Sequence, residues 1–297
     1  MALPTLRQLQ FFESLVRNQS FSRAADECHV SQSTLSAGVK ELEGVLEAML
    51  VDRTSRQFAL TTLGETIAVR AEEMLGLAHD MVRFAEARAP LTGDLRLGLI
   101  PTIGPFLLPQ FMPLATAQYP DLRLFLREEL TEQLVDGLRA GRIDIAVLAM
   151  PVETDGLDTL IFGEDTFLFA CGDDHPLANE KSVKSSQLKN EKLLLLEDGH
   201  CLRDHALSAC QLQTRDTADA FGATSLFTLA QMVRAGLGST LLPRLAVDAG
   251  LASAANLKTI PIAEGDGKAP SRDLGLAWRR GSGREAEAIA LAECLGQ

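Results

Sequence analysis

The sequence has no run of about 18 apolar residues, so no segment is expected to cross a membrane as a helix. Its first residues, Met1 to Arg7, lack a basic segment followed by an apolar core, so we expect no signal peptide. Five cysteines, an odd number in 297 residues, do not form the dense disulfide framework of a small secreted domain. No internal repeat or low-complexity tract is present. These absences predict a globular protein in the reducing cytoplasm.

Positive charge is also scarce, because 28 Lys and Arg stand against 40 Asp and Glu, for a net charge of −12. Residues 1–90 carry nine Lys and Arg and twelve Asp and Glu, a net −3, which leaves −9 for the rest. Phosphate attraction normally appears as a basic patch, so binding to nucleic acid must depend on where the few cations lie. At 46% hydrophobic content, the chain can form two or three compact units, each with its own core.

The first 45 residues have the pattern of a helix-turn-helix. Apolar residues from Leu6 to Val16 recur every three to four positions, which is the period of an amphipathic helix. Ser20 can cap a short helix through Cys28, and a turn at His29-Val30 leads to a second helix that Ser31 can cap. Such a second helix enters the DNA major groove.

Several polar residues of this region are candidate DNA contacts. We expect Gln32 and Thr34 to reach base edges from the exposed first turn of the second helix. Arg53 and Arg56 are expected to contact phosphates, beside a wing formed by the strand-like residues 57–61. The full candidate set is Ser31, Gln32, Ser33, Thr34, Ser36, Lys40, Arg53 and Arg56.

Residues 62 to 88 contain no proline and predict one long helix. Six residues spaced alternately four and three apart form a stripe, which favours a dimerising linker helix; packing against its own domain is the alternative. A hinge is expected at Pro90 to Gly93. The stripe consists of Ile67, Ala71, Met74, Ala78, Met81 and Ala85.

Beyond Gly93, strand and helix patterns alternate, which predicts parallel sheet with crossover helices. A first unit is expected to have strands at 94–100, 123–128 and 143–149 and helices at 105–119 and 133–140. A second unit is expected to have strands at 167–171, 193–196 and 239–242. A strand at 274–278 is expected to return to the first unit, before a final helix from Arg284.

The segment from Glu197 to Cys210 contains two cysteines nine residues apart. Asp198-Gly199 ends the apolar run and places Cys201 in or near the first turn of a helix. The helix dipole and nearby cations favour a thiolate there. An intact helix would hold the Cα atoms of Cys201 and Cys210 roughly 13 Å apart, whereas a disulfide tolerates about 7 Å. If these cysteines ever pair, the segment between them must be rebuilt.

Other interpretations of the cysteines are weaker. Cys201 and His205 lie four residues apart on the helix, with His200 and Cys210 close in sequence, but structural zinc sites favour short paired spacings such as C-x2-C. We therefore expect no metal and no cofactor. The isolated Cys28, Cys171 and Cys294 are expected to behave as small hydrophobic residues.

The run from Ser20 to Gly64 resembles the winged helix-turn-helix of LysR-type transcriptional regulators. It contains Ser-Phe-Ser-Arg-Ala-Ala, Val-Ser-Gln-Ser-Thr-Leu-Ser and Leu-Thr-Thr-Leu-Gly. It departs at Ser33, where the family usually has proline, and at residues 47–51, which replace a turn that usually contains glycine.

The resemblance implies an α/β protein of three parts. A winged helix-turn-helix domain is expected at 1–61, a linker and dimerisation helix at 62–90, and a redox-sensing effector domain of the periplasmic-binding-protein-like type at 91–297. Its lobe I would span about 91–163 and 269–297, and its lobe II about 164–268.

Residues Leu196 to Cys210, with Ala223 to Leu226 and Leu241 to Pro243, resemble the peroxide-sensing members of that family. This resemblance implies that peroxide oxidises Cys201 and that Cys210 resolves it as a disulfide. The disulfide would switch transcription of antioxidant genes, by activation or repression. The chain departs from these members at Gly222, where Arg is expected, and at Ala220.

The same resemblance implies residues that support the peroxide site. Thr102 and Thr131 would hold the peroxide and Arg272 would polarise the site, with Asp204 as a partner of Arg272. The full candidate set is Thr102, Thr131, His200, Arg203, Asp204 and Arg272.

The implied partners are double-stranded promoter DNA, hydrogen peroxide, RNA polymerase, and glutaredoxin or thioredoxin as reductant. A homotetramer built as a dimer of dimers is implied, and an enzyme is not. Three alternatives remain at this point: a metabolite-responsive LysR-type regulator with incidental cysteines, a thiol peroxidase, and a periplasmic solute receptor, which would need a signal peptide.

Overall fold

The computed structural model describes residues 2–52, 58–85, 89–189, 191–210, 222–263 and 269–296. The chain forms two compact units. The first comprises Met1–Ala87 with Arg139–Arg142, and the second comprises Arg88–Leu138 with Ile143–Gln297. Among the described residues, no helix is long and apolar enough to span a membrane.

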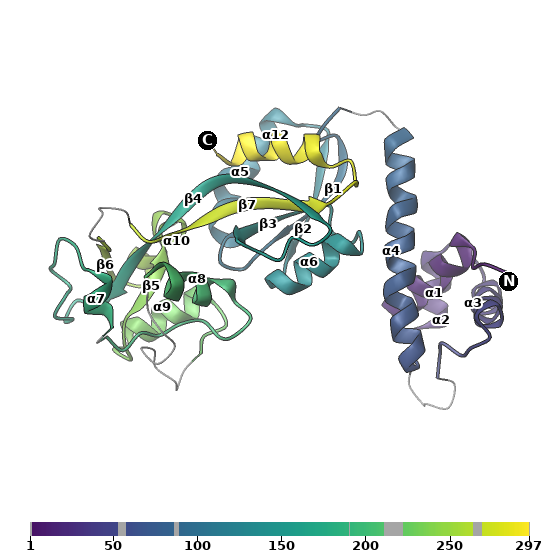
Figure 1. The fold of residues 1–297 in the computed structure, drawn as a ribbon, viewed down its shortest axis with the longest axis horizontal. Helices are drawn as coiled ribbons and strands as arrows, with labels where there is room; N and C mark the ends of the chain where they lie inside the picture. The colour runs from purple at the N-terminus through teal and green to yellow at the C-terminus, as the bar shows by residue number, and fades with distance from the viewer. Residues whose placement is uncertain are drawn as a thin grey trace. The chain divides into compact units, whose positions relative to one another are not determined.

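The first unit is helical (Figure 1). Its helices are α1 (Leu6–Asn18), α2 (Phe21–Glu27), α3 (Gln32–Leu46) and α4 (Thr62–Ala85). Ser20 and Ser31 cap α2 and α3 as predicted, because each hydroxyl accepts a hydrogen bond from the backbone N–H three residues later. Thr5 caps α1 in the same way. Phe12, Leu15, Leu35, Val39 and Leu42 are fully buried in the common core.

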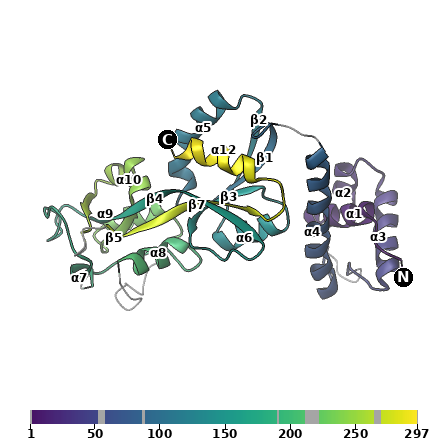
Figure 2. The ribbon, with the colours of Figure 1, turned by 45° about the horizontal axis from the view of Figure 1, so that its top comes forward.

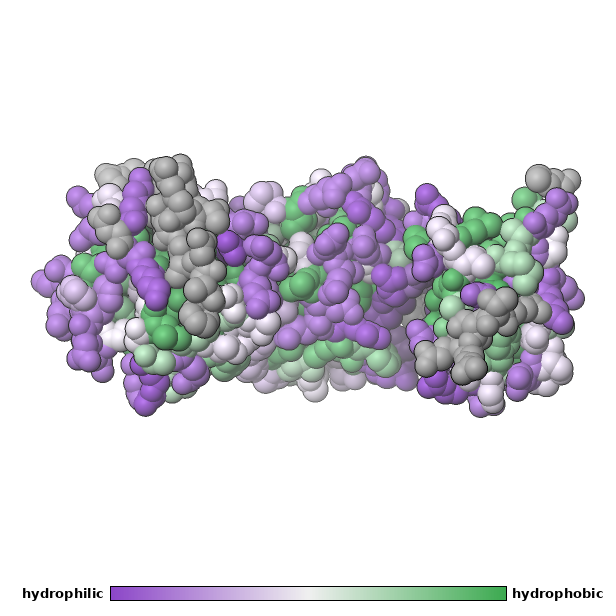
Figure 3. Space-filling model, turned by 90° about the horizontal axis from the view of Figure 1, so that it is seen from below, coloured by the Kyte–Doolittle hydropathy of each residue, from purple (hydrophilic) through white to green (hydrophobic). Residues whose placement is uncertain are grey.

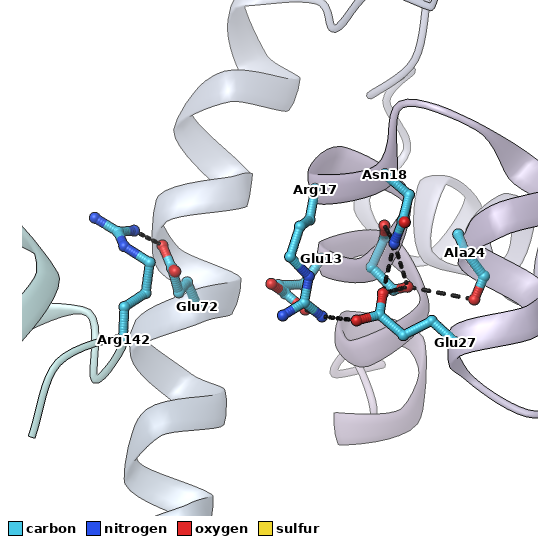
Figure 4. Close-up of polar contacts among 8 residues, drawn as sticks. Glu13, Arg17, Asn18, Ala24, Glu27, Glu72 and Arg142 are labelled. Atoms are coloured by element: carbon cyan, nitrogen blue, oxygen red, sulfur yellow. Dashed lines mark hydrogen bonds and ion pairs between the residues drawn. The ribbon is translucent and has the colours of Figure 1, made fainter. Parts of the chain in front are cut away.

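A polar cluster joins α1 to α2 beside this core (Figure 4). The carboxylate of Glu27 accepts hydrogen bonds from Ser14 Oγ at 2.6 Å and from Asn18 Nδ2 at 2.5 Å. It also forms an ion pair with Arg17 at 2.9 Å. The hydrogen bond from Ser14 and the charge of Arg17 lower the pKa of Glu27 below its ordinary value. This cluster fixes the angle at which the two helices meet.

The turn after α3 forms without a glycine. Glu47 ends α3 in the left-handed region, with φ 51°. The buried carboxylate of Glu43 accepts hydrogen bonds from the backbone N–H groups of Leu50 (2.9 Å) and Val51 (3.3 Å). Val51 then pairs with Leu60 in an antiparallel bridge. Much of the predicted wing, including Arg53 and Arg56, lies outside the described residues.

The long helix α4 follows, but the predicted stripe does not form one continuous surface. Ile67 and Ala71 pack against the core of their own unit, whereas Met74 and Met81 are exposed. The alternative interpretation therefore holds for the first half of the stripe. Further apolar residues of α4 are exposed, including Leu77 and Phe84.

The second unit contains a seven-stranded sheet with the path β2-β1-β3-β7-β4-β5, and β6 pairs with β4. Strands β1, β2 and β3 are parallel, and β7 runs antiparallel to β3 and β4. The strands are β1 (Gly93–Leu99), β2 (Leu122–Glu128), β3 (Ile145–Met150), β4 (Leu157–Cys171), β5 (Thr240–Pro243), β6 (Lys258–Pro261) and β7 (Ser271–Arg279). The helices are α5 (Gly104–Gln118), α6 (Thr131–Arg139), α7 (Ser185–Leu188), α8 (Cys201–Ala209), α9 (Leu226–Arg234), α10 (Arg244–Asp248), α11 (Leu251–Ala254) and α12 (Glu285–Leu295).

Two long strands run through both lobes of this unit (Figures 1 and 2). Strand β4 pairs with β7 from Leu157 to Thr166, and its second half pairs with β5 and β6. The lobe I core includes Leu97, Val147 and Leu291, and the lobe II core includes Phe169 and Leu242. The predicted two-lobed α/β fold with crossing strands is confirmed.

The strand predicted at 167–171 is confirmed, but it is only the second half of β4, which begins at Leu157. The strand predicted at 193–196 is wrong. Residues 193–196 are buried but form no strand, because only Leu193 and Leu196 pair, and they pair with different segments. Both differences arise because strand length depends on partners that are distant in sequence.

An aromatic pair also links the lobes. Phe106, near the start of α5, is buried in the lobe II core. Its ring stacks on that of Phe227 in α9, with centroids 5.7 Å apart. On the face seen in Figure 3, hydrophilic side chains cover much of the surface and apolar ones appear in separate areas.

Candidate functional site

The exposed face of α3 carries the candidate DNA contacts. Ser31, Gln32, Ser33, Thr34 and Lys40 are exposed, and Ser36 is half-buried. Ser31 Oγ lies 2.8 Å from Ser33 Oγ and 2.7 Å from Thr34 Oγ1. Ser33, which replaces the usual proline, therefore adds a hydroxyl to a cluster at the helix N-terminus. Backbone N–H groups and hydroxyls there suit contact with phosphate, while Gln32 remains free to extend outward.

The first residue of α8 is Cys201, as the sequence predicted. Gly199, with φ +93°, makes the turn that starts this helix, and a Cβ there would lie 3.4 Å from the Leu130 side chain. His200 is the N-cap residue, and burial lowers its pKa, opposed by the charge of Glu197. Cys201 is half-buried and packs against the lobe I core. Its thiol thus lies at the positive end of a helix dipole, within reach of small solutes.

Cys210 occupies the opposite end of α8. Its backbone N–H donates to Ala206 O at 3.1 Å, and its side chain is fully buried in the lobe II core. Neither Cys201 nor Cys210 forms a disulfide in this structure. Because the helix is continuous from Cys201 to Ala209, the Cα atoms of the two cysteines are separated by roughly 13 Å. A disulfide therefore requires α8 to unwind.

Arg272 of β7 lies at the centre of a buried polar network. Its Nη1 donates to Thr102 Oγ1 at 3.0 Å, and its Nη2 donates to the Thr102 carbonyl at 3.0 Å. Nε and Nη2 also bond to Asp165 Oδ2, at 3.1 and 2.9 Å. The other carboxylate oxygen accepts from the Leu245 backbone N–H at 3.0 Å. The structure thus brings Thr102 and Arg272 together, as the candidate site requires.

The expected partnership of Arg272 with Asp204 is wrong. Asp165 fills that position, while Asp204 is exposed on α8. Sequence reasoning missed Asp165, which lies 107 residues from Arg272. The available signal was a carboxylate inside an apolar strand, since a buried charge needs a partner.

Thr131 and Arg203 are the remaining candidate residues of the peroxide site. Thr131 begins α6, and its Oγ1 is buried without a hydrogen-bond partner among the described residues. Arg203 pairs with Asp198 at 3.1 Å. Gly222 has no side chain, and a Cβ there would lie 2.4 Å from Glu197 Cγ, so a larger residue would require Glu197 to move. Ala220 lies outside the described residues.

Cys171 and Cys294 have environments that oppose ionisation of their thiols. Burial and the charges of Glu191 and Asp173 raise the pKa of Cys171 to about 11. Burial also raises the pKa of Cys294. Within the described ranges, no cluster of His, Cys, Asp and Glu is arranged to hold a metal ion.

Two family models cover the chain almost from end to end. Residues 6–65 match the bacterial regulatory helix-turn-helix protein, lysR family, and residues 88–297 match the LysR substrate binding domain. The chain belongs to the LysR family. Its similarity to curated members extends over nearly its whole length.

Two of these relatives are transcriptional regulators, and each shares a similar percentage of identical residues with this chain. One is the HTH-type transcriptional regulator EstR of Acinetobacter baylyi, 39% identical over 99% of this chain and 97% of the relative. The other is the DNA-binding transcriptional dual regulator OxyR of Escherichia coli, 38% identical over 98% of this chain and 94% of the relative.

Solved structures of LysR-family proteins are also similar. Full-length OxyR of Pseudomonas aeruginosa, with an aspartate in place of one cysteine, superposes with a TM-score of 0.81 at 34% identity, covering 99% of this chain and 98% of that one. A hydrogen peroxide-bound cysteine-to-serine mutant of Corynebacterium glutamicum OxyR gives a TM-score of 0.68 at 33% identity, covering 99% and 92%.

Proposed function

We propose that this LysR-family regulator binds promoter DNA and is switched by hydrogen peroxide through a reversible disulfide between Cys201 and Cys210. The observation that carries the proposal is the position of the two thiols at opposite ends of α8. One thiol is accessible at the helix N-terminus and the other is buried, so oxidation must change the fold to join them. Relatives and solved structures of OxyR type support the same chemistry.

We propose that three polar side chains hold the peroxide near Cys201. Thr131 Oγ1 is a buried hydroxyl without a described partner, and Thr102 and Arg272 supply further polar groups. In the reaction, the Cys201 sulfur attacks one peroxide oxygen, the O–O bond breaks, and the departing hydroxide takes a proton to become water. Donors near that oxygen stabilise the hydroxide as it forms. The Cys210 sulfur then attacks the sulfenic acid, and a second water leaves.

The DNA-binding output is assigned to the exposed residues of α3. Gln32 and Thr34 are proposed to read base edges, and Arg53 and Arg56, which lie outside the described residues, are proposed to contact phosphates. We propose the domain limits 1–61, 62–90 and 91–297, a cytoplasmic location, and a tetramer that acts on RNA polymerase. Glutaredoxin or thioredoxin would return the disulfide to thiols.

The test compares the wild-type protein with Cys201→Ser. Differential alkylation and mass spectrometry measure both thiols before and after micromolar peroxide, and a DNA footprint is recorded on the same samples. We expect peroxide to join the wild-type thiols and change the footprint, and to do neither in the variant. Thiols that remain fully alkylatable would reject the proposal in favour of a metabolite-responsive regulator. Rapid multiple turnover with thioredoxin would favour a thiol peroxidase.

A further inference from the structure

Asp165 and Arg272 stand directly opposite each other on the antiparallel strands β4 and β7, and both side chains are almost completely buried. Asp165 Oδ2 accepts hydrogen bonds from Arg272 Nε at 3.1 Å and Nη2 at 2.9 Å. The other carboxylate oxygen accepts from the Leu245 backbone N–H at 3.0 Å. Because the carboxylate is held at both oxygens and binds one edge of the guanidinium, it fixes the plane of that group.

The fixed guanidinium determines the orientation of the Thr102 hydroxyl. Arg272 Nη1 donates to Thr102 Oγ1 at 3.0 Å, and Nη2 donates to the carbonyl of the same residue at 3.0 Å. A guanidinium has no acceptor, so Thr102 Oγ1 must be the acceptor in this contact. The hydroxyl hydrogen therefore points away from Arg272, and within the described part of the chain this hydroxyl makes no further hydrogen bond. Thr102 thus keeps one buried O–H available as a donor.

Thr102 lies in the turn between β1 and α5, beside the core that Cys201 contacts. Ile103, which follows Thr102, is fully buried in the lobe I core, and Cys201 packs against that core. Helix α8 packs against β7, the strand that carries Arg272 (Figure 2). Burial and the charge of Arg272 lower the pKa of His205, one turn beyond Cys201 on α8. The Thr102 hydroxyl and the Cys201 thiol therefore lie in the same region between the lobes.

We propose that Asp165 is a positioning residue for the oxidation of Cys201: it fixes Arg272 so that the Thr102 hydroxyl remains a hydrogen-bond donor to the departing hydroxide. This inference rests on the proposed function. In this step the Cys201 thiolate sulfur forms a bond to one oxygen of hydrogen peroxide, and the O–O bond breaks. The electron pair leaves with the other oxygen as hydroxide, which the Thr102 hydroxyl stabilises until solvent protonates it. Sulfur is thereby oxidised and peroxide reduced.

Asp165 acts through two other residues, so its contribution is specific to reactions in which a negatively charged oxygen departs. Iodoacetamide alkylates the same thiolate but releases iodide, which needs no hydroxyl donor at this position. Both reactions depend equally on access to Cys201 and on ionisation of its thiol. A comparison of the two rates therefore separates the positioning role from a general disturbance of the site.

The test uses full-length protein that carries Cys210→Ser, so that the sulfenic acid cannot close to a disulfide; this is the parent protein. Asp165→Asn removes the charge that fixes Arg272. Thr102→Val removes the hydroxyl but keeps the shape of the side chain, whereas Thr102→Ser keeps a hydroxyl. A further variant combines Asp165→Asn with Thr102→Val.

The matched control is Asp158→Asn, because Asp158 lies on the same strand but pairs with Arg280 at the surface. Circular dichroism first establishes a temperature at which each variant is folded. Dimedone trapping then measures sulfenic acid formation with peroxide. Mass spectrometry of the peptide that contains Cys201 measures alkylation by iodoacetamide.

We expect Asp165→Asn and Thr102→Val each to slow sulfenic acid formation by roughly ten- to a hundredfold, up to the loss typical of one missing oxyanion donor. Alkylation should stay within about twofold of the parent protein, and Thr102→Ser should keep most of the peroxide rate. The combined variant should be no slower than the slower single variant, because both changes remove the same donor. Asp158→Asn should leave both rates unchanged.

Three outcomes would overturn the inference: the parent peroxide rate in Asp165→Asn or Thr102→Val, equal losses of reactivity with peroxide and iodoacetamide, or additive losses in the combined variant. If Asp165→Asn does not fold, Asp165→Glu replaces it with the same expected loss, since glutamate keeps the charge but moves the carboxylate by one methylene. If peroxide leaves Cys201 unmodified in the parent protein while iodoacetamide alkylates it, the proposed function fails instead.

Discussion

At the scale of single residues, the buried pair of Asp165 and Arg272 determines how the crossing strands meet. Both side chains are almost fully inaccessible, at 2% and 0% exposed. Removing one partner of such a pair leaves an uncompensated charge in the interior, which costs more than the pair itself contributes. The network therefore makes the position of Thr102 depend on Asp165, a residue far from it in sequence.

Asp165→Asn should destabilise the second unit by about 3–5 kcal/mol, because Arg272 would lose its counter-charge. Urea unfolding at pH 7 measures this as a lower midpoint with an unchanged slope. Asp158→Asn is the matched control, since Asp158 lies on the same strand but pairs with Arg280 at the surface. That change should cost less than about 1 kcal/mol. Equal effects of the two substitutions would contradict the role of burial.

The pKa of Asp144 predicts how the stability of lobe I changes at acidic pH. Its burial alone would raise the pKa, but hydrogen bonds and charge from Arg96, with the charge of Arg284, lower it below the ordinary value. A lowered folded-state pKa stabilises the protein above the unfolded-state pKa of about 3.9 and loses this contribution as pH falls through the folded-state value.

Asp144→Asn should therefore destabilise the protein at pH 7 and bring it closer to wild type as pH falls below about 4. Urea midpoints measured from pH 7 to pH 3 test this convergence. A constant difference between the two proteins across that range would show that Asp144 does not titrate with the proposed sign.

At the scale of elements, α8 depends on its packing. A nine-residue helix is marginal in isolation, so the burial of Leu202, Ala206 and Leu207 must hold it. Opening the helix exposes these side chains, and this cost favours the dithiol over the disulfide. On the mechanism proposed above, the stability of α8 therefore sets the redox potential of the Cys201–Cys210 pair.

Leu207→Ala should make the reduction potential of the Cys201–Cys210 pair more negative by about 40–100 mV. A core Leu→Ala change destabilises the closed, reduced form by about 2–5 kcal/mol, whereas it does not destabilise the opened, oxidised form. A free-energy difference of 1.4 kcal/mol corresponds to about 30 mV. Equilibration with glutathione buffers measures the shift. Leu291→Ala, in the lobe I core, is the control and should leave the potential unchanged. A potential that becomes more positive in Leu207→Ala would contradict this account.

The elements differ in how far sequence alone predicts them. The caps at Ser20 and Ser31 and the helix start at Cys201 depend on neighbouring residues, so their local patterns were sufficient. After Leu157, the first half of β4 consists of half-buried and exposed residues, and it depends on pairing with β7, a strand far away in sequence. The link from Asp165 to Arg272 joins segments 107 residues apart, so a local pattern can mark the buried carboxylate but not its partner.

At the scale of the whole molecule, the exposed side of α4 predicts self-association. Met74, Leu77, Met81 and Phe84 follow a three-four-three spacing and are 47–73% exposed. Apolar side chains in such a row normally contact another chain. The first half of the helix is already used by its own unit, which leaves this second half for a partner copy.

Leu77→Asp with Met81→Asp should reduce the oligomer mass and weaken binding to a two-site operator. Sedimentation and a gel-shift assay measure these effects. His79→Asp, which adds an aspartate at an exposed position of the same helix without removing an apolar side chain, is the control and should leave the mass unchanged. An unchanged oligomer in the double variant would place the dimer contact elsewhere in the chain.

The burial of Cys210 makes the response of the proposed switch depend on how long peroxide is present. On the mechanism proposed above, oxidation of Cys201 requires only a collision with peroxide, whereas disulfide formation must wait until the fully buried Cys210 thiol leaves the lobe II core. A pulse of peroxide shorter than that delay leaves a sulfenic acid on Cys201, which cellular thiols can reduce before the disulfide forms. Persistent oxidant keeps the first thiol modified until the second arrives. Under this mechanism, the buried Cys210 side chain makes the regulator respond to sustained peroxide and not to brief rises in its concentration.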